Sequence, residues 1–253
     1  MIFPLAVLAF VLLGSYLWWN RSALLVQVAH KAFQKGDEVA ALAAFARAEA
    51  AGRLGTEATA SYAYLALKNG RTDEAALVLA QAFSSGRRGK ALKPSEKRLL
   101  QTYQALVLWK QDNLDEAVAL LEGLLADGYR TLTLYGNLGF FLLEQGNVAR
   151  AETVCLEAAD WDPEGKVILD NLASVYLEKE EWKKAAEVYD RLLALEPRFP
   201  EAWHGAGWAS LKTGDAAEAQ RRWERALELP FHSLTTVERP AIERALQSLQ
   251  PRP

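Results

Sequence analysis

The chain has 253 residues, a formal net charge of −3 and a composition that is 51% hydrophobic. The slightly acidic balance argues against a nucleic-acid-binding protein, which needs a basic surface, and the single cysteine, Cys155, excludes an internal disulfide framework. Sixteen glycines and nine prolines are few for this length, so the abundant alanine and leucine favour helices packed against helices, either in compact domains or in one elongated repeat array.

The first nineteen residues, Met1–Trp19, contain no charged side chain. As a helix they would be about 28 Å long, close to the hydrocarbon thickness of a bilayer. Tyr16, Trp18 and Trp19 gather at the end of this run, where aromatic rings suit the headgroup level. No basic residue precedes the run and no small-residue cleavage site ends it, so the sequence favours an uncleaved transmembrane anchor over a cleaved signal peptide or a buried globular helix.

Basic residues follow the apolar run at Arg21, Lys31 and Lys35. The positive-inside bias then places the rest of the chain in the cytoplasm and the N-terminus outside. The sequence therefore predicts a single-pass membrane protein, with the bacterial inner membrane as its expected location.

Three consecutive segments, 132–165, 166–199 and 200–233, have the same length of 34 residues and one shared pattern. In each segment a large residue is followed four positions later by a small one, and later an alanine is followed four positions on by another large residue. These positions hold Tyr135, Gly139, Ala151 and Cys155, then Leu169, Ala173, Ala185 and Tyr189, then Trp203, Gly207, Ala219 and Trp223. A strict period of this kind predicts stacked pairs of antiparallel helices.

The pattern resembles that of the tetratricopeptide-repeat family, W-x2-L-G-x2-Y…A-x3-F…P. The resemblance implies an all-α fold, a right-handed superhelix of about six helix-turn-helix repeats. Three earlier segments match it more weakly, at 22–55, 56–89 and 98–131, with eight additional residues, Lys90–Lys97, before the last of them. Residues 235–250 predict a capping helix, with Thr235 or Thr236 as the N-cap and Pro240 in the first turn. The expected organisation is thus an anchor over 1–19, a solenoid over 22–233 and a cap over 235–250.

Packing roles follow from the pattern. Small residues let neighbouring helices approach closely, and large residues fill the space beside them; the small ones are Ala63, Gly139, Ala173 and Gly207, and the large ones are Tyr135, Tyr176, Trp203 and Trp223. A glycine in the left-handed conformation is expected to end the first helix of a pair, at Gly36, Gly70, Gly146 and Gly214. Cys155 occupies a large slot, which predicts a buried side chain.

No arrangement of residues indicates catalysis. The three histidines, His30, His204 and His232, are far apart and share no metal-ligand spacing. Cys155 has no histidine near it in the sequence, and the chain contains no glycine-rich phosphate loop. We therefore expect no enzymatic activity, no metal and no cofactor.

A basic run interrupts the repeats between the second and third weak segments. It comprises Arg87, Arg88, Lys90, Lys93, Lys97 and Arg98, opposed only by Glu96. The residues before it, Ser84–Gly86, favour a loop. A solvated insertion is the simpler interpretation, and contact with anionic lipid headgroups or an acidic partner is the alternative.

The family resemblance also implies a binding surface, because the first helices of tetratricopeptide repeats line a concave groove that holds peptides. Asn137 and Asn171 lie 34 residues apart and are expected to stack in register, with amides that hold the backbone of an extended segment. An ordinary hydrogen bond on the helix surface is the alternative role for each. The other residues expected along this groove are Phe140, Glu144, Ser174, Glu178, His204, Trp208 and Lys212, with Phe140 and Trp208 as aromatic anchors.

Some members of the family clamp the C-terminal carboxylate of heat-shock chaperones with basic residues. Here Phe140 and Glu144 stand where such a cluster would be needed, which disfavours that role. The sequence thus predicts a membrane-anchored scaffold or adaptor that binds other proteins in its groove. Two alternatives stay open, an extracytoplasmic protein that assists a secretion or envelope-assembly complex, and a self-assembling structural protein.

Overall fold

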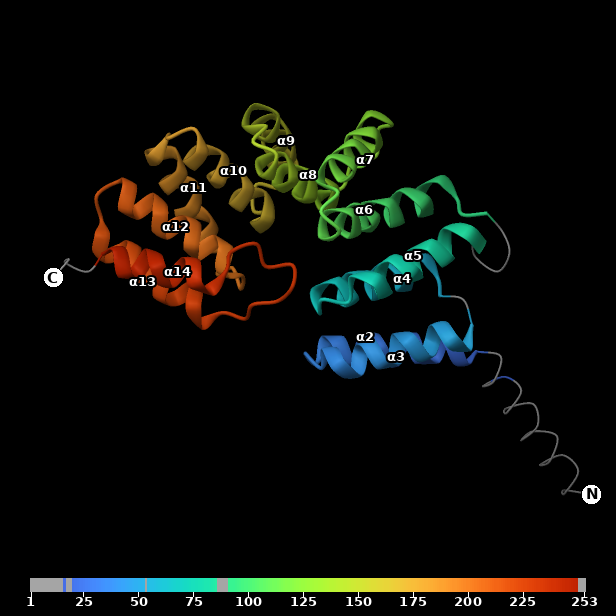
Figure 1. Ribbon diagram of the computed structural model, residues 1–253. Coiled ribbons are helices and arrows are strands. Elements are labelled where there is room, and N and C mark those ends of the chain that lie inside the picture. The colour runs from blue at the N-terminus through green and yellow to red at the C-terminus, as the bar shows by residue number, and fades with distance from the viewer. Residues whose placement is uncertain (1–15, 17–19, 53, 86–90, 250–253) are drawn as a thin grey trace, which may run out of the picture. The chain divides into compact units, whose positions relative to one another are not determined.

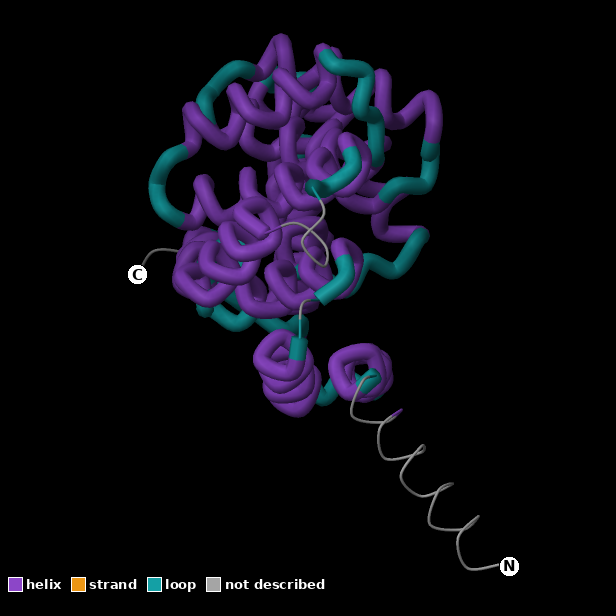
Figure 2. The backbone as a smooth tube through the Cα atoms, turned by 90° about the vertical axis from the view of Figure 1, so that its right-hand side faces the viewer, coloured by secondary structure: helices purple, strands orange, loops and turns teal. Residues whose placement is uncertain are grey.

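The computed structural model describes residues 16, 20–52, 54–85 and 91–249. The chain divides into two compact units, Met1–Val107 and Leu108–Pro253. Within the described residues both units consist of helices joined by turns and loops, with no strand (Figures 1 and 2). The all-α class predicted from the sequence is confirmed.

The first unit contains two helix pairs and most of a fifth helix. In chain order these are α2 (Arg21–Gln34), α3 (Glu38–Ala51), α4 (Thr56–Lys68), α5 (Thr72–Ser85) and α6 (Pro94–Lys110). Helix α2 packs along α3, α4 packs along α5, and α3 contacts α4. The pairs are therefore stacked through neighbour contacts, as in a helical repeat.

The second unit continues from the last turn of α6. Its helices are α7 (Leu114–Ala126), α8 (Leu132–Glu144), α9 (Val148–Trp161), α10 (Lys166–Glu178), α11 (Trp182–Ala194), α12 (Pro200–Lys212), α13 (Ala216–Glu228) and α14 (Arg239–Ser248). Helices α8, α10 and α12 begin at residues 132, 166 and 200, which keeps one interval of 34 residues. Each packs against the helix that follows it, and α10 also contacts both α8 and α12, so these three helices form one inner layer.

The turns inside the pairs share one geometry. Gly36, Gly70, Gly146 and Gly214 have φ angles of 78°, 74°, 74° and 96°, which confirms the predicted left-handed helix ends. Asp112 and Glu180 adopt the same conformation without glycine, at 62° and 58°. In all six turns the next residue donates its N–H to a carbonyl five residues earlier, at distances between 2.8 and 3.0 Å, and this bond satisfies a carbonyl at the helix end.

Close approach of helices depends on the predicted small residues. A Cβ atom on Gly207 would lie 2.2 Å from Trp223 Nε1, and one on Gly139 would lie 2.8 Å from Cys155 Sγ. Trp223 and Cys155 are both fully buried, as predicted. Trp203, predicted as a core residue, is only half-buried, because it lies in the first turn of α12, where Nε1 donates to the carbonyl of Pro197 and Arg225 covers the ring.

The last helix covers the end of the second unit. Ile242 and Ala245 of α14 are buried against the cluster around Trp223. Helix α14 begins later than predicted, with Glu238 rather than a threonine as its N-cap. The two threonines act in the preceding connection instead: the Thr235 hydroxyl accepts the N–H of His232, and the N–H of Thr236 donates to Glu201.

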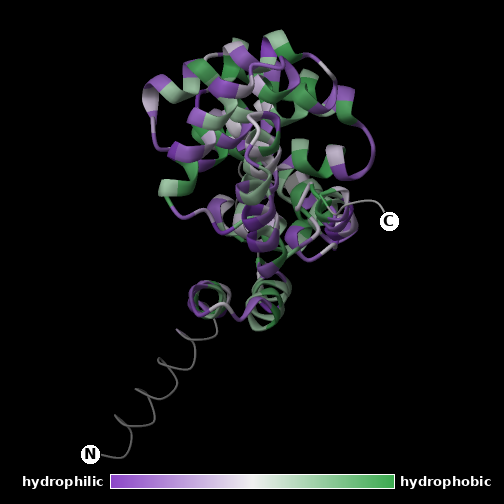
Figure 3. Cartoon of the chain, turned by 90° about the vertical axis from the view of Figure 1, so that its left-hand side faces the viewer, coloured by the Kyte–Doolittle hydropathy of each residue, from purple (hydrophilic) through white to green (hydrophobic). Residues whose placement is uncertain are grey.

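The connection between α13 and α14 is also held from the other end of the second unit. Lys110 Nζ donates to the carbonyl oxygen of Ser233 at 2.9 Å. Figure 3 shows hydrophobic residues along the helices and many hydrophilic residues in the connections between them. This distribution is typical of helices that bury one face against their neighbours.

The membrane prediction requires correction. The run Met1–Trp19 lies outside the described residues, apart from Tyr16. Among the residues that the structure describes, no helix has both the length and the apolar composition needed to cross a bilayer. The longest of these helices, α6, has 17 residues and contains several charged side chains. On this finding the predicted single-pass, inner-membrane location with a cytoplasmic solenoid is wrong.

Candidate protein-binding groove

The second unit contains a cavity of about 650 Å³, within the usual range for ligand clefts. We call it the inner pocket, and it is lined by α8, α10, α11, α12 and residues 236–241. Seven of the nine residues predicted for the groove line it, namely Phe140, Glu144, Asn171, Ser174, Glu178, His204 and Trp208. Asn137 and Lys212 do not line it. Lys212 is exposed instead, with Nζ 4.9 Å from the centre of the Trp182 ring.

The two asparagines of the expected ladder differ in their surroundings. Asn171 is only 5% exposed, and its Nδ2 donates to the carbonyl oxygen of Gly136 at 2.8 Å. This bond joins α10 to α8, so the amide nitrogen of Asn171 already has a partner within the fold. Asn137 Nδ2 is enclosed and has no hydrogen-bond partner among the described residues. Equal spacing therefore does not give these amides equal environments.

The α12 side of the inner pocket is aromatic. Trp208 is half-buried, and its ring centre lies 5.1 Å from that of Trp223 in an edge-to-face arrangement. Trp208 Nε1 donates to His204 Nε2 at 3.1 Å. Burial lowers the pKa of His204 to about 4, which keeps its imidazole neutral and able to accept this bond at neutral pH. Trp208 thus presents one part of its ring to the pocket while the other part packs on the core.

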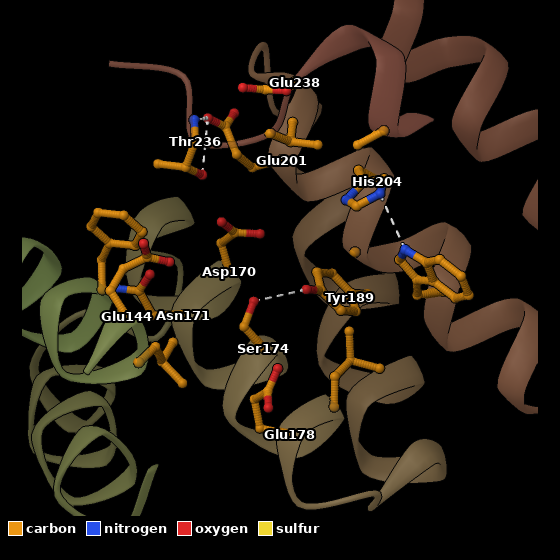
Figure 4. A pocket seen from close by; sticks show the side chains of 17 residues that line it. Glu144, Asp170, Asn171, Ser174, Glu178, Tyr189, Glu201, His204, Thr236 and Glu238 are labelled. Carbon is orange, nitrogen blue, oxygen red and sulfur yellow. Dashed lines mark hydrogen bonds between the residues drawn. The ribbon is translucent and has the colours of Figure 1, made fainter. Parts of the chain in front are cut away.

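Among the described residues, five carboxylates line the inner pocket and no lysine or arginine does so. They are Glu144, Asp170, Glu178, Glu201 and Glu238. Glu144, Glu178 and Glu238 are exposed, whereas Asp170 and Glu201 are partly buried. Figure 4 shows Asp170 in the middle of the group, between Glu201 and Ser174. The arrangement makes the pocket strongly acidic in a chain whose overall charge is only −3.

Asp170 has the least favourable environment of the five. Its Oδ1 is enclosed and has no hydrogen-bond partner among the described residues. Burial, and secondly the negative charge of Glu201, raise the pKa of Asp170 to about 8. Burial also raises the pKa of Glu201, although Glu201 accepts the N–H of Thr236 at 2.7 Å. Close to Asp170, the buried hydroxyl of Tyr189 lies 3.1 Å from Ser174 Oγ.

Sequence reasoning missed Asp170, Tyr189, Glu201 and Glu238. The helical period could have found the first, because Asp170 lies one turn before Ser174 on α10. The same period could have found Glu201, which lies one turn before His204 on α12. It could not have found Tyr189, which comes from a second helix of a pair, or Glu238, which lies beyond the last repeat. Their position depends on how α11 and the connection before α14 pack against α12.

The single cysteine of the chain is not suited to act as a nucleophile. Cys155 is fully buried, and burial raises the pKa of its thiol to about 12, so a thiolate is disfavoured. No group of three metal-ligating side chains occurs among the described residues. The inner pocket therefore offers hydrogen-bond acceptors, negative charge and aromatic surface, which are properties of a binding site.

Two residues of the predicted basic loop belong to a helix instead. Arg87, Arg88 and Lys90 lie outside the described residues. Helix α6 begins at Pro94, so Lys97 and Arg98 are helical rather than part of a loop. Lys93 is exposed just before α6, and its backbone N–H donates to the carboxylate of Glu96, which fixes the helix start.

Comparison with known proteins identifies the repeat. Sequence models of the tetratricopeptide repeat match residues 104–165 and 168–202. Together the two matches cover less than half of the chain. The matched residues span the last part of α6, all of α7, α8, α9 and α11, most of α10 and the start of α12, and they contribute most of the residues that line the inner pocket.

One curated relative and two solved structures extend this finding. The chain is 36% identical over 88 residues to the protein ycf37 of Pyropia yezoensis, a match that covers 30% of this chain and 49% of ycf37. It resembles a tetratricopeptide repeat protein from Parabacteroides merdae with a TM-score of 0.68 and 13% identity, over 91% of this chain and 84% of that one. It resembles TTC0263 from Thermus thermophilus with a TM-score of 0.59 and 19% identity, over 77% and 98%.

The structural likenesses show the fold alone at these identities, and the chain spans about half the length of ycf37. Together with the two sequence matches they support the tetratricopeptide-repeat family and confirm the helical-repeat architecture. Proteins with this fold generally mediate interactions between proteins as scaffolds and are generally not enzymes.

Proposed function

We propose that this protein is a non-enzymatic scaffold that binds an extended segment of a partner protein in the inner pocket. The observation that supports this proposal best is the position of the pocket on the inner layer, where α8, α10 and α12 each contribute side chains. In a repeat protein such a layer offers equivalent positions at regular intervals, which suits an extended chain.

The chemistry of the lining supports the same role. Phe140 and Trp208 come from different helices and are both only partly buried, so each leaves aromatic surface for a partner. Aromatic residues of this kind dominate binding energy at protein interfaces. Ser174 adds a hydroxyl, and Glu144 and Glu178 add acceptors, which can orient the backbone and side chains of the bound segment.

The proposal is tested by site-specific photocrosslinking in cells that make the full chain. A benzoyl-phenylalanine residue replaces Phe140 in the inner pocket, or Leu156 on α9 as the control, since Leu156 is a large hydrophobic residue that is 44% exposed and does not line the pocket. We expect a crosslinked partner at position 140 that is absent at position 156 and weakened by Trp208→Ala. Equal crosslinking at both positions, or none at position 140, contradicts the proposal.

A further inference from the structure

We propose that the inner pocket recognises a lysine or arginine side chain of the partner's bound segment, and that Asp170 is the carboxylate that pairs with it. This inference rests on the proposed function of the same site and specifies the kind of segment that the site accepts. It follows from the charge of the lining, the environment of Asp170 and the surfaces on either side of it.

The charge of the inner pocket is one-sided. Its five carboxylates come from α8, α10, α12 and the residue before α14, and no basic side chain from the part of the chain that the structure describes lines the cavity. Among the described residues none of the five forms an ion pair. Some carboxylates elsewhere in the second unit do form ion pairs, as in Arg150 with Glu122 and Lys179 with Glu152. A concave surface that holds one sign of charge raises the local concentration of the opposite charge.

Asp170 supplies an independent observation. Its Oδ1 is enclosed without a hydrogen-bond partner among the described residues, and Figure 4 shows its carboxylate directed into the pocket. A buried carboxylate without a donor is unfavourable for the fold. A ligand that donates hydrogen bonds and carries positive charge removes this penalty, and the lysine ammonium and the arginine guanidinium are the protein groups that do both.

The rest of the lining suits such a ligand. The hydroxyls of Ser174 and Tyr189 lie beside Asp170 and can accept further N–H bonds. Trp208 and Phe140 offer aromatic surface for the aliphatic stem or for a cation–π contact. A bound metal ion fits less well, because no three ligating side chains of the described residues are close enough together to hold one.

The test measures binding of short peptides to the full chain by fluorescence anisotropy. Four labelled nonapeptides share a Gly-Ser-Ala scaffold and a central leucine, and carry three lysines, three arginines, three glutamines or three glutamates. We expect the lysine and arginine peptides to bind at least about 10-fold more tightly than the glutamine peptide at about 0.15 M salt, and the glutamate peptide not to bind.

Two pocket variants and one control variant show which carboxylates are responsible for binding the basic peptides. Asp170→Asn keeps the shape of the side chain and should weaken binding of the lysine peptide about 10-fold, because an amide cannot form the ion pair with the ammonium group. The triple variant Glu144→Gln, Glu178→Gln and Glu238→Gln removes exposed charges at the pocket and should mainly slow association. The control Asp160→Asn, Glu164→Gln and Glu187→Gln removes three exposed carboxylates that do not line the pocket and should change affinity by less than about 2-fold.

Three results would overturn the inference. Tight binding of the glutamine peptide that Trp208→Ala abolishes would keep the groove function and overturn recognition of a basic side chain. If the control triple variant and Asp170→Asn lost equal amounts of affinity for the lysine peptide, surface charge alone would attract the peptide, and the inference would also be overturned. Absence of binding by all four peptides overturns it as well, and photocrosslinking at position 140 then decides the groove function separately.

Discussion

The two sides of α12 differ in how their polar groups are paired. On the side that faces α13, Gly207 lies against the indole of Trp223, whose Nε1 donates to the carbonyl of His204 at 2.9 Å, and Arg222 pairs with carboxylates on α11 and α13. On the side that faces the inner pocket, Glu201 lies near Asp170, whose Oδ1 accepts no hydrogen bond from any described residue. The first side satisfies its polar groups, and the second leaves the Asp170 carboxyl group without a hydrogen-bond partner among the described residues. A buried carboxyl group with a raised pKa and no partner is typical of a binding or functional site rather than of a stabilising contact.

The largest effect is expected on the α13 side. Replacing Trp223 by alanine removes a fully buried indole and should lower the free energy of unfolding by about 3–5 kcal/mol. Urea unfolding followed by circular dichroism measures this loss. Trp208→Ala is the matched control and should cost clearly less, because the Trp208 ring is only half-buried. Equal losses in the two variants would remove the contrast between the sides of α12.

A smaller loss is expected from Gly207→Ala. The new methyl group would lie 2.2 Å from Trp223 Nε1, so the indole must move and weaken its bond to the carbonyl of His204. Overpacking of this kind costs about 1–3 kcal/mol. Gly123→Ala on α7 is the control, because an added Cβ there meets no atom within 4 Å, and the melting temperature should not fall in that variant.

Asp170→Asn should raise the free energy of unfolding at high pH, whereas the two preceding variants lower it. The pKa of Asp170 is raised to about 8, so the unfolded chain loses this proton near pH 4 while the folded chain retains it to higher pH. The contribution of Asp170 to the free energy of unfolding therefore falls as pH rises from about 4 to about 8. The variant should be more stable than the parent by about 1–3 kcal/mol above pH 8.

Thermal unfolding at several pH values measures this difference, which should vanish near pH 4. Glu187→Gln removes an exposed carboxylate and should show no such dependence. Should Asp170→Asn destabilise the protein at pH 8, Asp170 would be a structural residue with a donor, and its proposed role would be wrong.

The smallest effect concerns the asparagine pair. Asn171→Ala removes the bond to the Gly136 carbonyl and should lower stability by about 1–2 kcal/mol. Asn137→Ala removes an amide nitrogen without a partner among the described residues and should have less effect. Denaturant midpoints of the two variants distinguish them, and equal midpoints would restore the symmetrical ladder that their spacing suggests.

The difference between the two sides of α12 also shows which features of the protein the sequence could predict. Helix pairs, left-handed turns and the close contact of Gly207 with Trp223 depend on residues a few turns apart, so a 34-residue period reveals them. The isolation of Asp170 depends on α10, α12 and the connection before α14 coming together, and a period cannot show that. Register placed Asn171 on the inner layer, yet it could not show that its amide bonds to Gly136. For Met1–Trp19, composition suggested a membrane span, and no described helix supports one.

The hydrogen bond from Lys110 to Ser233 joins residues 123 positions apart. Repeat arrays held together only by neighbour contacts open from their ends, one pair at a time. In this unit the bond links the last turn of α6 to the connection that carries α14, so loosening either end disturbs the other. Amide hydrogen exchange near Lys110 and in α14 should therefore be coupled, and the second unit should unfold more cooperatively than an open stack of the same length.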